Sequence, residues 1–387
     1  MRIVADENIP YAEEAFGRLG SVRRMPGRSI TREALLDADA LIVRSITRVN
    51  ADLLRDTPVR FVGTCTIGED HVDRTWLAEH GIAFASAPGC NANSVADYIT
   101  AALLYLEARH GVRLNGASIG IIGVGNVGSR VARRAQALGM RVMLNDPPRA
   151  EKEPGFSSVA LKTALACDFI TLHVPLEKNG PWPTWHMIDA ERLQQLRPDA
   201  LLLNSSRGVV VDNAALLNHL ELGKLRGCVL DVWEGEPAPD PRLIRRSDLA
   251  TPHIAGYSFD GKVNGTRQVY EALCRYLGVT PDWDPAPLLP PLDCPEVTVD
   301  PSDPEALRKA VFAVYDIRKD DARMRPLADL ADPAERGKAF DHLRKTYPRR
   351  REFLNTVARL AQHDEATAAT LRGLGFQLLT NMEEAHP

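Results

Sequence analysis

The sequence predicts an α/β protein with two doubly wound parallel sheets and a smaller C-terminal α+β domain. Short apolar runs alternate with helical stretches in two successive series, which is typical of parallel sheets flanked by helices. A glycine-rich turn at residues 123–128 opens the second series, and the composition becomes proline-dense after Asp282. The turn indicates a cofactor domain, and the change of composition indicates the start of a third domain.

The first series predicts strands at 1–7, 40–45 and 60–65, with a helix at 11–20. A long helix at 94–110 leads into the second series. Its apolar runs are nearly continuous rather than alternating, as expected for strands that are covered on both faces. They predict strands at 118–124, 141–146, 169–174, 201–206 and 227–232, and a last short strand at 250–256.

The C-terminal part begins with the proline-dense stretch 281–295, which cannot continue a helix or a central strand and is interpreted as a linker. One short strand is predicted after it, at 296–300. Helices are predicted over 305–322, 334–347 and 351–362. The tail is therefore expected to be a small α+β domain of roughly 100 residues.

Composition excludes several classes of protein. The chain has 387 residues, 44% hydrophobic and 25% charged, which suits a globular protein of two to three domains. A net charge of −4 argues against nucleic-acid binding. The six cysteines form no CxxC pair, so neither a metal site nor a disulfide is expected. No signal pattern and no apolar run of about 20 residues is present, so we expect a cytoplasmic protein without membrane contact.

The glycine-rich turn has the spacing GxGxxG between a predicted strand and a predicted helix. Gly123 permits the tight turn, Gly125 lets the backbone approach a pyrophosphate, and Gly128 lets the helix pack on the strand. The next strand ends at Asp146, 18 residues beyond Gly128, where an acid binds the ribose hydroxyls and repels a 2′-phosphate. The pattern predicts NAD as cofactor, although Arg149 could accommodate the phosphate of NADP. The alternative is a strand–helix turn that binds nothing.

Polar residues follow three predicted strands of the second series: Arg207, Glu236 with Asp231, and His253. Ligands of open α/β sheets bind beyond the carboxyl ends of the strands, so these side chains are expected to face the cofactor. Each has an alternative interpretation, as a surface arginine, a turn acid or a structural histidine. Their joint occurrence after a cofactor motif favours catalysis.

This set suits the oxidation of a 2-hydroxy acid. The cofactor takes a hydride from C2, and a base must take the hydroxyl proton. His253 is the candidate base, because histidine titrates near the working pH, and Glu236 would orient its ring and stabilise the imidazolium. Arg207 offers a planar, charged clamp for the substrate carboxylate.

Several motifs, in this order, resemble the D-2-hydroxyacid dehydrogenase family over roughly residues 40–260: GCNANSVADY, GxGxxG, HVPL, NSSRG, DVWEGEP and TPHIAG. The resemblance implies a Rossmann-type cofactor domain, residues 94–256, inserted in a flavodoxin-like substrate domain, 1–93 with 257–285. It implies that Asp231 contacts the nicotinamide side of NAD. The cofactor-binding candidates are Gly123, Gly125, Asn126, Val127, Gly128, Asp146, Val174, Ser206, Asp231 and Gly256.

Nearly the whole chain resembles one branch of that family, through ADENIP, VRSITRVN, VGTCTIGEDHVD, HIAGYSFDGK and AVYDIRKDDARMR. This resemblance implies a small phosphorylated hydroxy-acid substrate and a homodimer formed through residues 286–387. It also implies that Ser45, Thr66 and Tyr257 contact substrate. For the substrate phosphate, Arg44 is the nearest candidate. The basic cluster of Lys345 and residues 349–351 is another, with a solvated helix start as the favoured alternative.

Two competing functions stay open. The first is another dehydrogenase of the same fold, acting on 3-phosphoglycerate or hydroxypyruvate. The second is a co-repressor-like protein that binds NAD as a signal without catalysis, since a fold and its site can be reused. Turnover of a 2-hydroxy acid would exclude the second function, and the choice of substrate would settle the first.

Overall fold

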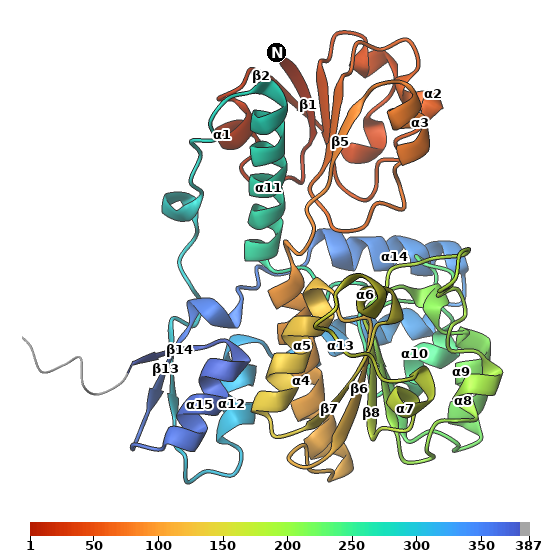
Figure 1. Ribbon diagram of the computed structural model, residues 1–387, viewed down its shortest axis with the longest axis vertical. Helices are drawn as coiled ribbons and strands as arrows, with labels where there is room; N and C mark the ends of the chain where they lie inside the picture. The colour runs from red at the N-terminus through yellow and green to blue at the C-terminus, as the bar shows by residue number, and fades with distance from the viewer. Residues whose placement is uncertain (380–387) are drawn as a thin grey trace, which may run out of the picture. The chain divides into compact units, whose positions relative to one another are not determined.

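The computed structural model describes residues 1–379, which form two compact units (Figure 1). One unit combines Met1–Asn91 with Ser258–Pro291, and the other combines Ala92–Tyr257 with the chain from Leu292 onward. These breaks lie close to the boundaries predicted for the substrate domain. Within residues 1–379, no helix has both the length and the apolar character that crossing a bilayer requires.

The first unit is built on a five-stranded parallel sheet of order β2-β1-β3-β4-β5. Its strands are β1 (Arg2–Asp6), β2 (Ser21–Met25), β3 (Ala40–Val43), β4 (Phe61–Thr64) and β5 (Ala83–Ala85). Sequence analysis missed β2 and β5, which are short strands at the two edges of the sheet. β2 is largely exposed, so its burial pattern carries no continuous apolar signal.

Helices cover both faces of this sheet (Figure 1). Apolar side chains of α11 pack with Ile3, Ile42 and Phe61 in one core cluster. Ser258 caps the start of α11 by accepting from the Gly261 amide, and the helix ends at Gly278 with a φ of 70°. The helices are α1 (Ala12–Phe16), α2 (Ala51–Leu54), α3 (Arg74–Glu79) and α11 (Phe259–Leu277), with 3-10 turns at Gly27–Ser29, Glu33–Leu35 and Ala286–Leu288.

The second unit contains a six-stranded parallel sheet of order β11-β10-β9-β8-β6-β7. Its strands are β6 (Ser118–Ile122), β7 (Arg141–Asn145), β8 (Phe169–Leu172), β9 (Leu201–Asn204), β10 (Gly227–Leu230) and β11 (Leu249–Ala250). The helices are α4 (Ala92–His110), α5 (Asn126–Ala137), α6 (Pro147–Lys152), α7 (Leu161–Leu165), α8 (Ala190–Leu193), α9 (Asn213–Glu221) and α10 (Pro241–Arg246). The first five strands predicted for this series are present, and the predicted α/β fold class is confirmed. The predicted strand at 250–256 is wrong beyond Ala250, because the following residues form a loop whose Ile254 and Ala255 amides donate to Asp231.

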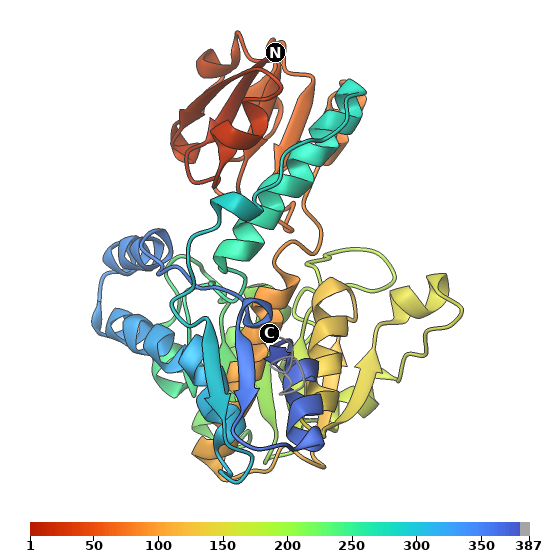
Figure 2. The same cartoon turned by 90° about the vertical axis from the view of Figure 1, so that its left-hand side faces the viewer.

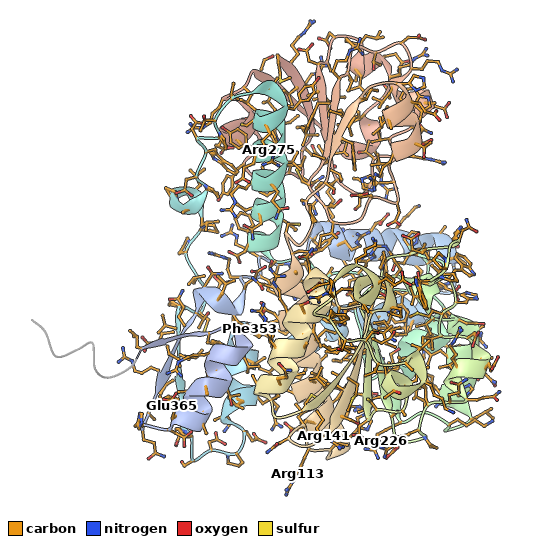
Figure 3. All side chains as sticks on the ribbon, viewed as in Figure 1. Arg113, Arg141, Arg226, Arg275, Phe353 and Glu365 are labelled. Carbon is orange, nitrogen blue, oxygen red and sulfur yellow. The ribbon has the colours of Figure 1, made fainter. Side chains whose placement is uncertain are left out.

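Successive residues of these strands face two separate cores, as expected for a sheet that is buried on both sides. One core packs strand residues such as Ile121 and Leu203 against α4 and α5, and the other packs Ile170 and Leu202 against α7–α10. Arg141 and Arg226 mark the amino-terminal edge of the sheet together with Arg113 (Figure 3). The candidate site residues follow the opposite, carboxyl-terminal edge.

The chain beyond Leu292 contains a third parallel sheet of order β12-β13-β14, which corrects the expectation of a single strand (Figure 2). The predicted helix at 351–362 is wrong, because this stretch forms a 3-10 turn (Phe353–Asn355) and β13. The strand pairs on both of its edges, and tertiary pairing overrides the weak helical pattern. The elements are β12 (Glu296–Val299), α12 (Ala306–Val314), α13 (Ile317–Met324), a 3-10 turn (Arg325–Asp329), α14 (Pro333–Lys345), β13 (Val357–Leu360), α15 (Glu365–Leu374) and β14 (Gln377–Leu379).

This C-terminal segment has its own sheet but shares a hydrophobic core with the cofactor-type sheet. Val311, Phe353 and Leu371 belong to the same buried cluster as Leu103 of α4 and Ala135 of α5. Phe353, labelled in Figure 3, stacks on Phe376 with 5.0 Å between ring centroids. The segment is therefore packed as part of the second unit rather than tethered to it.

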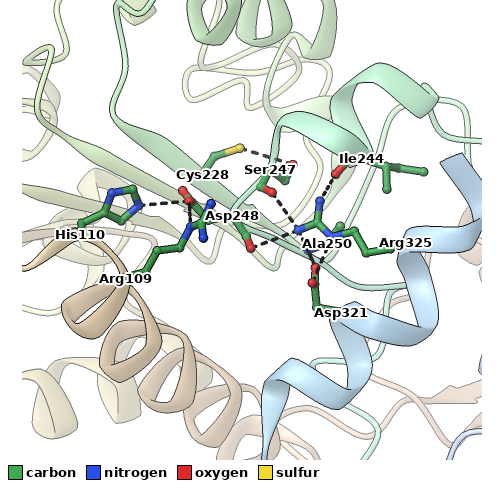
Figure 4. A network of polar contacts seen from close by, with 9 residues as sticks. All are labelled: Arg109, His110, Cys228, Ile244, Ser247, Asp248, Ala250, Asp321 and Arg325. Atoms are coloured by element: carbon green, nitrogen blue, oxygen red, sulfur yellow. Dashed lines mark hydrogen bonds and ion pairs between the residues drawn. The ribbon is translucent and has the colours of Figure 1, made fainter.

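Helix α13 also covers the edge strand β11 (Figure 4). Asp321 accepts a 2.8 Å hydrogen bond from the Ala250 amide, and Arg325 donates to the Ser247 carbonyl at 2.8 Å. The Asp248 carboxylate accepts from Arg109 at 2.7 Å and contacts His110 at 3.1 Å. An exposed parallel edge would leave backbone groups unpaired. The C-terminal segment thus fixes the strand that leads into the loop of His253.

Candidate active site

The glycine turn lies between β6 and α5, and its surroundings leave no room for a side chain at Gly123 or Gly128. Gly123 has a φ of +85°, and a Cβ there would lie 2.7 Å from the His173 carbonyl carbon. A Cβ at Gly128 would lie 2.0 Å from the Gly123 carbonyl oxygen. At Gly125 a Cβ would meet nothing within 4 Å, so the backbone borders open space.

The N-terminus of α5 is free to bind an anion. Gly125 is its N-cap residue, and no side chain caps the helix, so the amides of the first turn, which begins with Asn126 and Val127, point outward without a side-chain acceptor. A helix of 12 residues directs its positive dipole end there. This donor set and the open space at Gly125 fit the pyrophosphate of a dinucleotide.

Asp146 follows β7 and connects two parts of the proposed cofactor site. One carboxylate oxygen accepts from the Val124 amide at 2.8 Å, and the other accepts from the Arg149 amide at 3.0 Å, capping α6. The Arg149 guanidinium pairs with Glu153 and donates to the Val124 carbonyl, at 2.6 and 2.7 Å. Arg149 is thus held by its own neighbours, and the acid borders the glycine turn.

We expect Asp146→Ala to weaken NADH binding about 10- to 100-fold, because a charged acceptor at the ribose and at the Val124 amide is lost. NADPH should lose less, so the preference between the two cofactors narrows. Dissociation constants for both nucleotides, measured by fluorescence titration, check this. Unchanged affinity for both would remove Asp146 from the ribose site.

His253 and Glu236 form a close pair at the carboxyl-terminal edge of the sheet. The His253 Nδ1 and a Glu236 carboxylate oxygen are 2.8 Å apart, and the other Glu236 oxygen accepts from the Trp233 amide at 2.9 Å. Burial works to raise the pKa of Glu236, but the His253 charge and these hydrogen bonds lower it overall. The carboxylate therefore stays ionised near neutral pH and fixes one ring nitrogen of His253.

The loop that carries His253 is held by Asp231, which is buried. Its carboxylate accepts from the Thr251 hydroxyl at 2.6 Å and from the amides of Ile254 and Ala255 at 2.8 and 2.9 Å. His253 itself has a φ of +57°, an uncommon conformation for a non-glycine residue. Asp231 therefore holds the loop of His253 in place. The resemblance implies that it also contacts the nicotinamide side of NAD.

Arg207 follows β9, the strand next to β10 in the sheet. It is half-buried, and its Nη1 donates to the Ser206 carbonyl at 2.8 Å. Asn204 fixes the turn by donating to the Arg207 carbonyl and accepting from the Ser206 hydroxyl, at 3.0 and 2.8 Å. A Cβ at Gly208 would lie 2.0 Å from Trp233 backbone, so the loops after β9 and β10 touch. The structure thus gathers Arg207, Glu236 and His253 at the ends of three adjacent strands.

The residues after β8 contribute an uncharged wall beside the glycine turn. Val174 approaches Gly123, whose added Cβ would lie 2.9 Å from its Cγ1. Valine at this position offers only its backbone groups for a polar contact. Burial lowers the pKa of His173 to about 3, so its ring is neutral, and Nε2 bonds the Thr171 hydroxyl at 3.0 Å.

Ser45, Thr66 and Arg44 belong to the first unit, at the carboxyl ends of β3 and β4. Thr66 shares a 2.8 Å hydrogen bond with the Thr64 hydroxyl and donates to the Gly68 carbonyl at 3.1 Å. Arg44 donates to the Asn8 carbonyl at 3.3 Å, and Ser45 is exposed. Tyr257 belongs instead to the second unit, with Gly256 beside it in the loop of His253.

The sequence missed Arg344, a residue of α14 whose guanidinium carbon lies 5.5 Å from the Tyr257 ring centroid. Nothing in its local sequence distinguishes it from its basic neighbours, since only folding brings α14 to the loop. The favoured interpretation of the neighbouring cluster as a solvated helix start is wrong for Arg350. That residue is buried, donates to the Ala255 carbonyl and stacks 4.2 Å over the Tyr315 ring.

The cofactor-type sheet matches a known family. Residues 98–255 match the NAD-binding domain of the D-isomer specific 2-hydroxyacid dehydrogenases, and residues 288–375 match a domain of unknown function. The D-lactate dehydrogenase of Aquifex aeolicus, solved with NAD and lactic acid, has a TM-score of 0.60 and 26% identity over 71% of this chain and 95% of its own. The TT0316 protein of Thermus thermophilus has a TM-score of 0.62 and 28% identity over 73% and 98%. Fold and site thus define an NAD-dependent dehydrogenase.

Curated relatives match the whole chain. The erythronate-4-phosphate dehydrogenase of Cellvibrio japonicus is 50% identical over 97% of this chain and 100% of its own length. That of Salinibacter ruber is 50% identical over 98% and 99%. The chain therefore belongs to the D-isomer specific 2-hydroxyacid dehydrogenase family, in the group of the erythronate-4-phosphate dehydrogenases.

Proposed function

We propose that the protein oxidises 4-phospho-D-erythronate to (R)-3-hydroxy-2-oxo-4-phosphooxybutanoate with NAD, a step in the formation of pyridoxal 5′-phosphate. The chain is 50% identical to the two named relatives over nearly their whole length, which supports this substrate. The observation that carries the chemistry is the 2.8 Å contact between His253 Nδ1 and Glu236 at the edge of the sheet that bears the glycine turn.

His253 is proposed as the general base. With Nδ1 donating to the ionised Glu236, the proton of a neutral ring sits on Nδ1, and Nε2 presents a lone pair. Nε2 then accepts the proton of the C2 hydroxyl, and Glu236 stabilises the imidazolium that results. NAD, which the glycine turn and Asp146 would hold, would supply the hydride acceptor for C2. The hydroxyl oxygen thereby loses a proton and C2 loses a hydride, so the C2–O bond becomes the carbonyl of the 2-oxo acid.

Arg207 is proposed to hold the substrate carboxylate, because a guanidinium forms two parallel hydrogen bonds to a carboxylate and keeps C2 in one orientation. Its backbone is fixed by Asn204, while the side chain is half-buried at the same edge as His253. From the resemblance, Ser45, Thr66 and Tyr257 are proposed as further substrate contacts. Ser206, Val174, Asp231 and Gly256 are proposed as cofactor contacts.

The substrate is tested by steady-state turnover with NAD on 4-phosphoerythronate, 3-phosphoglycerate and a reverse assay with hydroxypyruvate. The first is expected to give the highest kcat/KM. A higher value for either of the others would make the protein a different dehydrogenase of this fold. Binding of NAD without turnover of any of them would favour the non-catalytic, NAD-sensing alternative.

A cytoplasmic homodimer formed through residues 286–387 is also proposed, on the resemblance alone. The chain mass is 42.6 kDa, so light scattering of the purified full-length protein should give twice that value. A mass equal to one chain would remove the dimer.

A further inference from the structure

The C-terminal segment reaches the proposed active site through α14. A Cβ at Gly337, in the middle of this helix, would lie 3.3 Å from Pro237, the residue after Glu236. Only a small residue lets the helix approach the Glu236–Pro237 turn so closely. The helix then ends at Lys345, which brings its last turn, with Arg344, toward the loop of His253.

Arg344 is oriented toward this loop and not toward a carboxylate partner. Its guanidinium lies 5.5 Å from the Tyr257 ring centroid, a favourable cation–π distance. Its charge also acts on Glu236, as the smallest of the influences that lower the pKa of that carboxyl. Within residues 1–379, no carboxylate lies in ion-pair range of Arg344, and its buried Nε has no hydrogen-bond partner.

Arg350, six positions further along, is a buried guanidinium of the same segment whose charge is balanced by neighbouring groups. It lies among Asp97 and Asp320, whose charges favour its ionised form, and it donates to the Ala255 carbonyl. Burial works against the charge of Arg344, but its interactions with Tyr257, Glu236 and Asp341 raise its pKa overall, so its guanidinium is ionised. Its buried Nε still has no acceptor, and an anion that enters the site would supply one.

The proposed substrate carries two anionic groups. A phosphomonoester has a charge of about −1.5 to −2 at neutral pH, in addition to the carboxylate. Arg207 can neutralise only one of these groups, and the second needs its own cation. Arg344 lies over the Tyr257 ring, and its charge acts on Glu236, the partner of His253.

We propose that Arg344 binds the phosphate of the substrate and makes the enzyme prefer phosphorylated over unphosphorylated 2-hydroxy acids. This inference rests on the proposed function. It gives the C-terminal segment, which matches a domain of unknown function, a direct part in substrate recognition.

The test compares wild type with Arg344→Gln, using 4-phosphoerythronate and unphosphorylated erythronate as substrates and inorganic phosphate as a competing anion. We expect kcat/KM for the phosphorylated substrate to fall about 10- to 100-fold, mainly through KM, while that for erythronate stays within about threefold. The inhibition constant of inorganic phosphate should rise by a similar factor. Arg344→Lys keeps the charge but not the fork of donors and should fall between the two.

Lys338→Gln is the matched control, because it removes an exposed charge from the same helix and should behave as wild type. NADH affinity and melting temperature, measured for each variant, report whether the fold is kept. The role of Arg344 would be overturned by an equal loss of kcat/KM on both substrates or by a pH profile that shifts on both. An unchanged inhibition constant for phosphate would overturn it as well. If wild type fails to oxidise 4-phosphoerythronate while turning over another acid, the proposed substrate fails instead.

Discussion

Replacement of His253 by alanine is expected to lower the rate of substrate oxidation by about 10²- to 10⁴-fold, the usual contribution of a positioned general base. The reason is that no other side chain is proposed to accept the C2 hydroxyl proton, while Glu236 is held by His253 and the Trp233 amide. NAD affinity should change little, since the glycine turn and Asp146 lie after β6 and β7. Single-turnover rates and a separate NADH titration measure the two effects.

The control for this variant is His363→Gln, which removes an exposed imidazole from the C-terminal segment and should leave turnover unchanged. Glu236→Gln should fall between the control and His253→Ala, because the ring keeps a hydrogen-bond partner but loses the charge that stabilises the imidazolium. Near-normal turnover by His253→Ala would assign the base to another residue.

Phe353→Ala is expected to have the largest effect on stability, a loss of about 3–5 kcal/mol in the free energy of unfolding. The ring is fully buried, stacks on Phe376 and lies 5.3 Å from the guanidinium carbon of Arg134 in α5. The Phe353 amide also donates to Asp97 at 3.2 Å. Because α5 is the helix of the glycine turn, NAD affinity should weaken along with the melting temperature.

The neighbouring Leu354 provides a matched control. It is 39% exposed, so Leu354→Ala should change the unfolding free energy by about 0.5 kcal/mol or less. Denaturant unfolding of the two variants compares a buried with an exposed apolar truncation at consecutive positions. If both lose the same amount, or if Phe353→Ala unfolds in two separate steps, the C-terminal segment does not share a core with α5.

The parallel sheets could be predicted because their central strands are continuous apolar runs, as in 201–203 and 227–230. The glycine spacing was equally informative, since Gly123 and Gly128 leave no room for a Cβ and Gly125 borders open space. The order of polar residues after the strands indicated that Glu236 and His253 would meet, and their 2.8 Å contact agrees with that expectation.

The C-terminal segment could not be predicted in the same way. Strand β13 contains Arg359 between apolar residues and pairs with strands about 60 residues before and 20 after it, so its identity is decided by long-range pairing. The position of Arg344 depends on how α14 packs against Pro237, and neither residue type nor spacing records that contact. Local patterns thus specify elements, while contacts between distant elements specify the remaining part of the site.

Asp146 has a consequence for any attempt to convert the enzyme to NADP. The same carboxylate that would repel a 2′-phosphate also accepts from the Val124 amide and caps the first turn of α6. Exchanging it for a neutral or basic residue would remove the expected repulsion of the 2′-phosphate and would also leave the Val124 and Arg149 amides without their acceptor. Redesign of the coenzyme choice therefore requires at least a second substitution that supplies a new acceptor for those two amides.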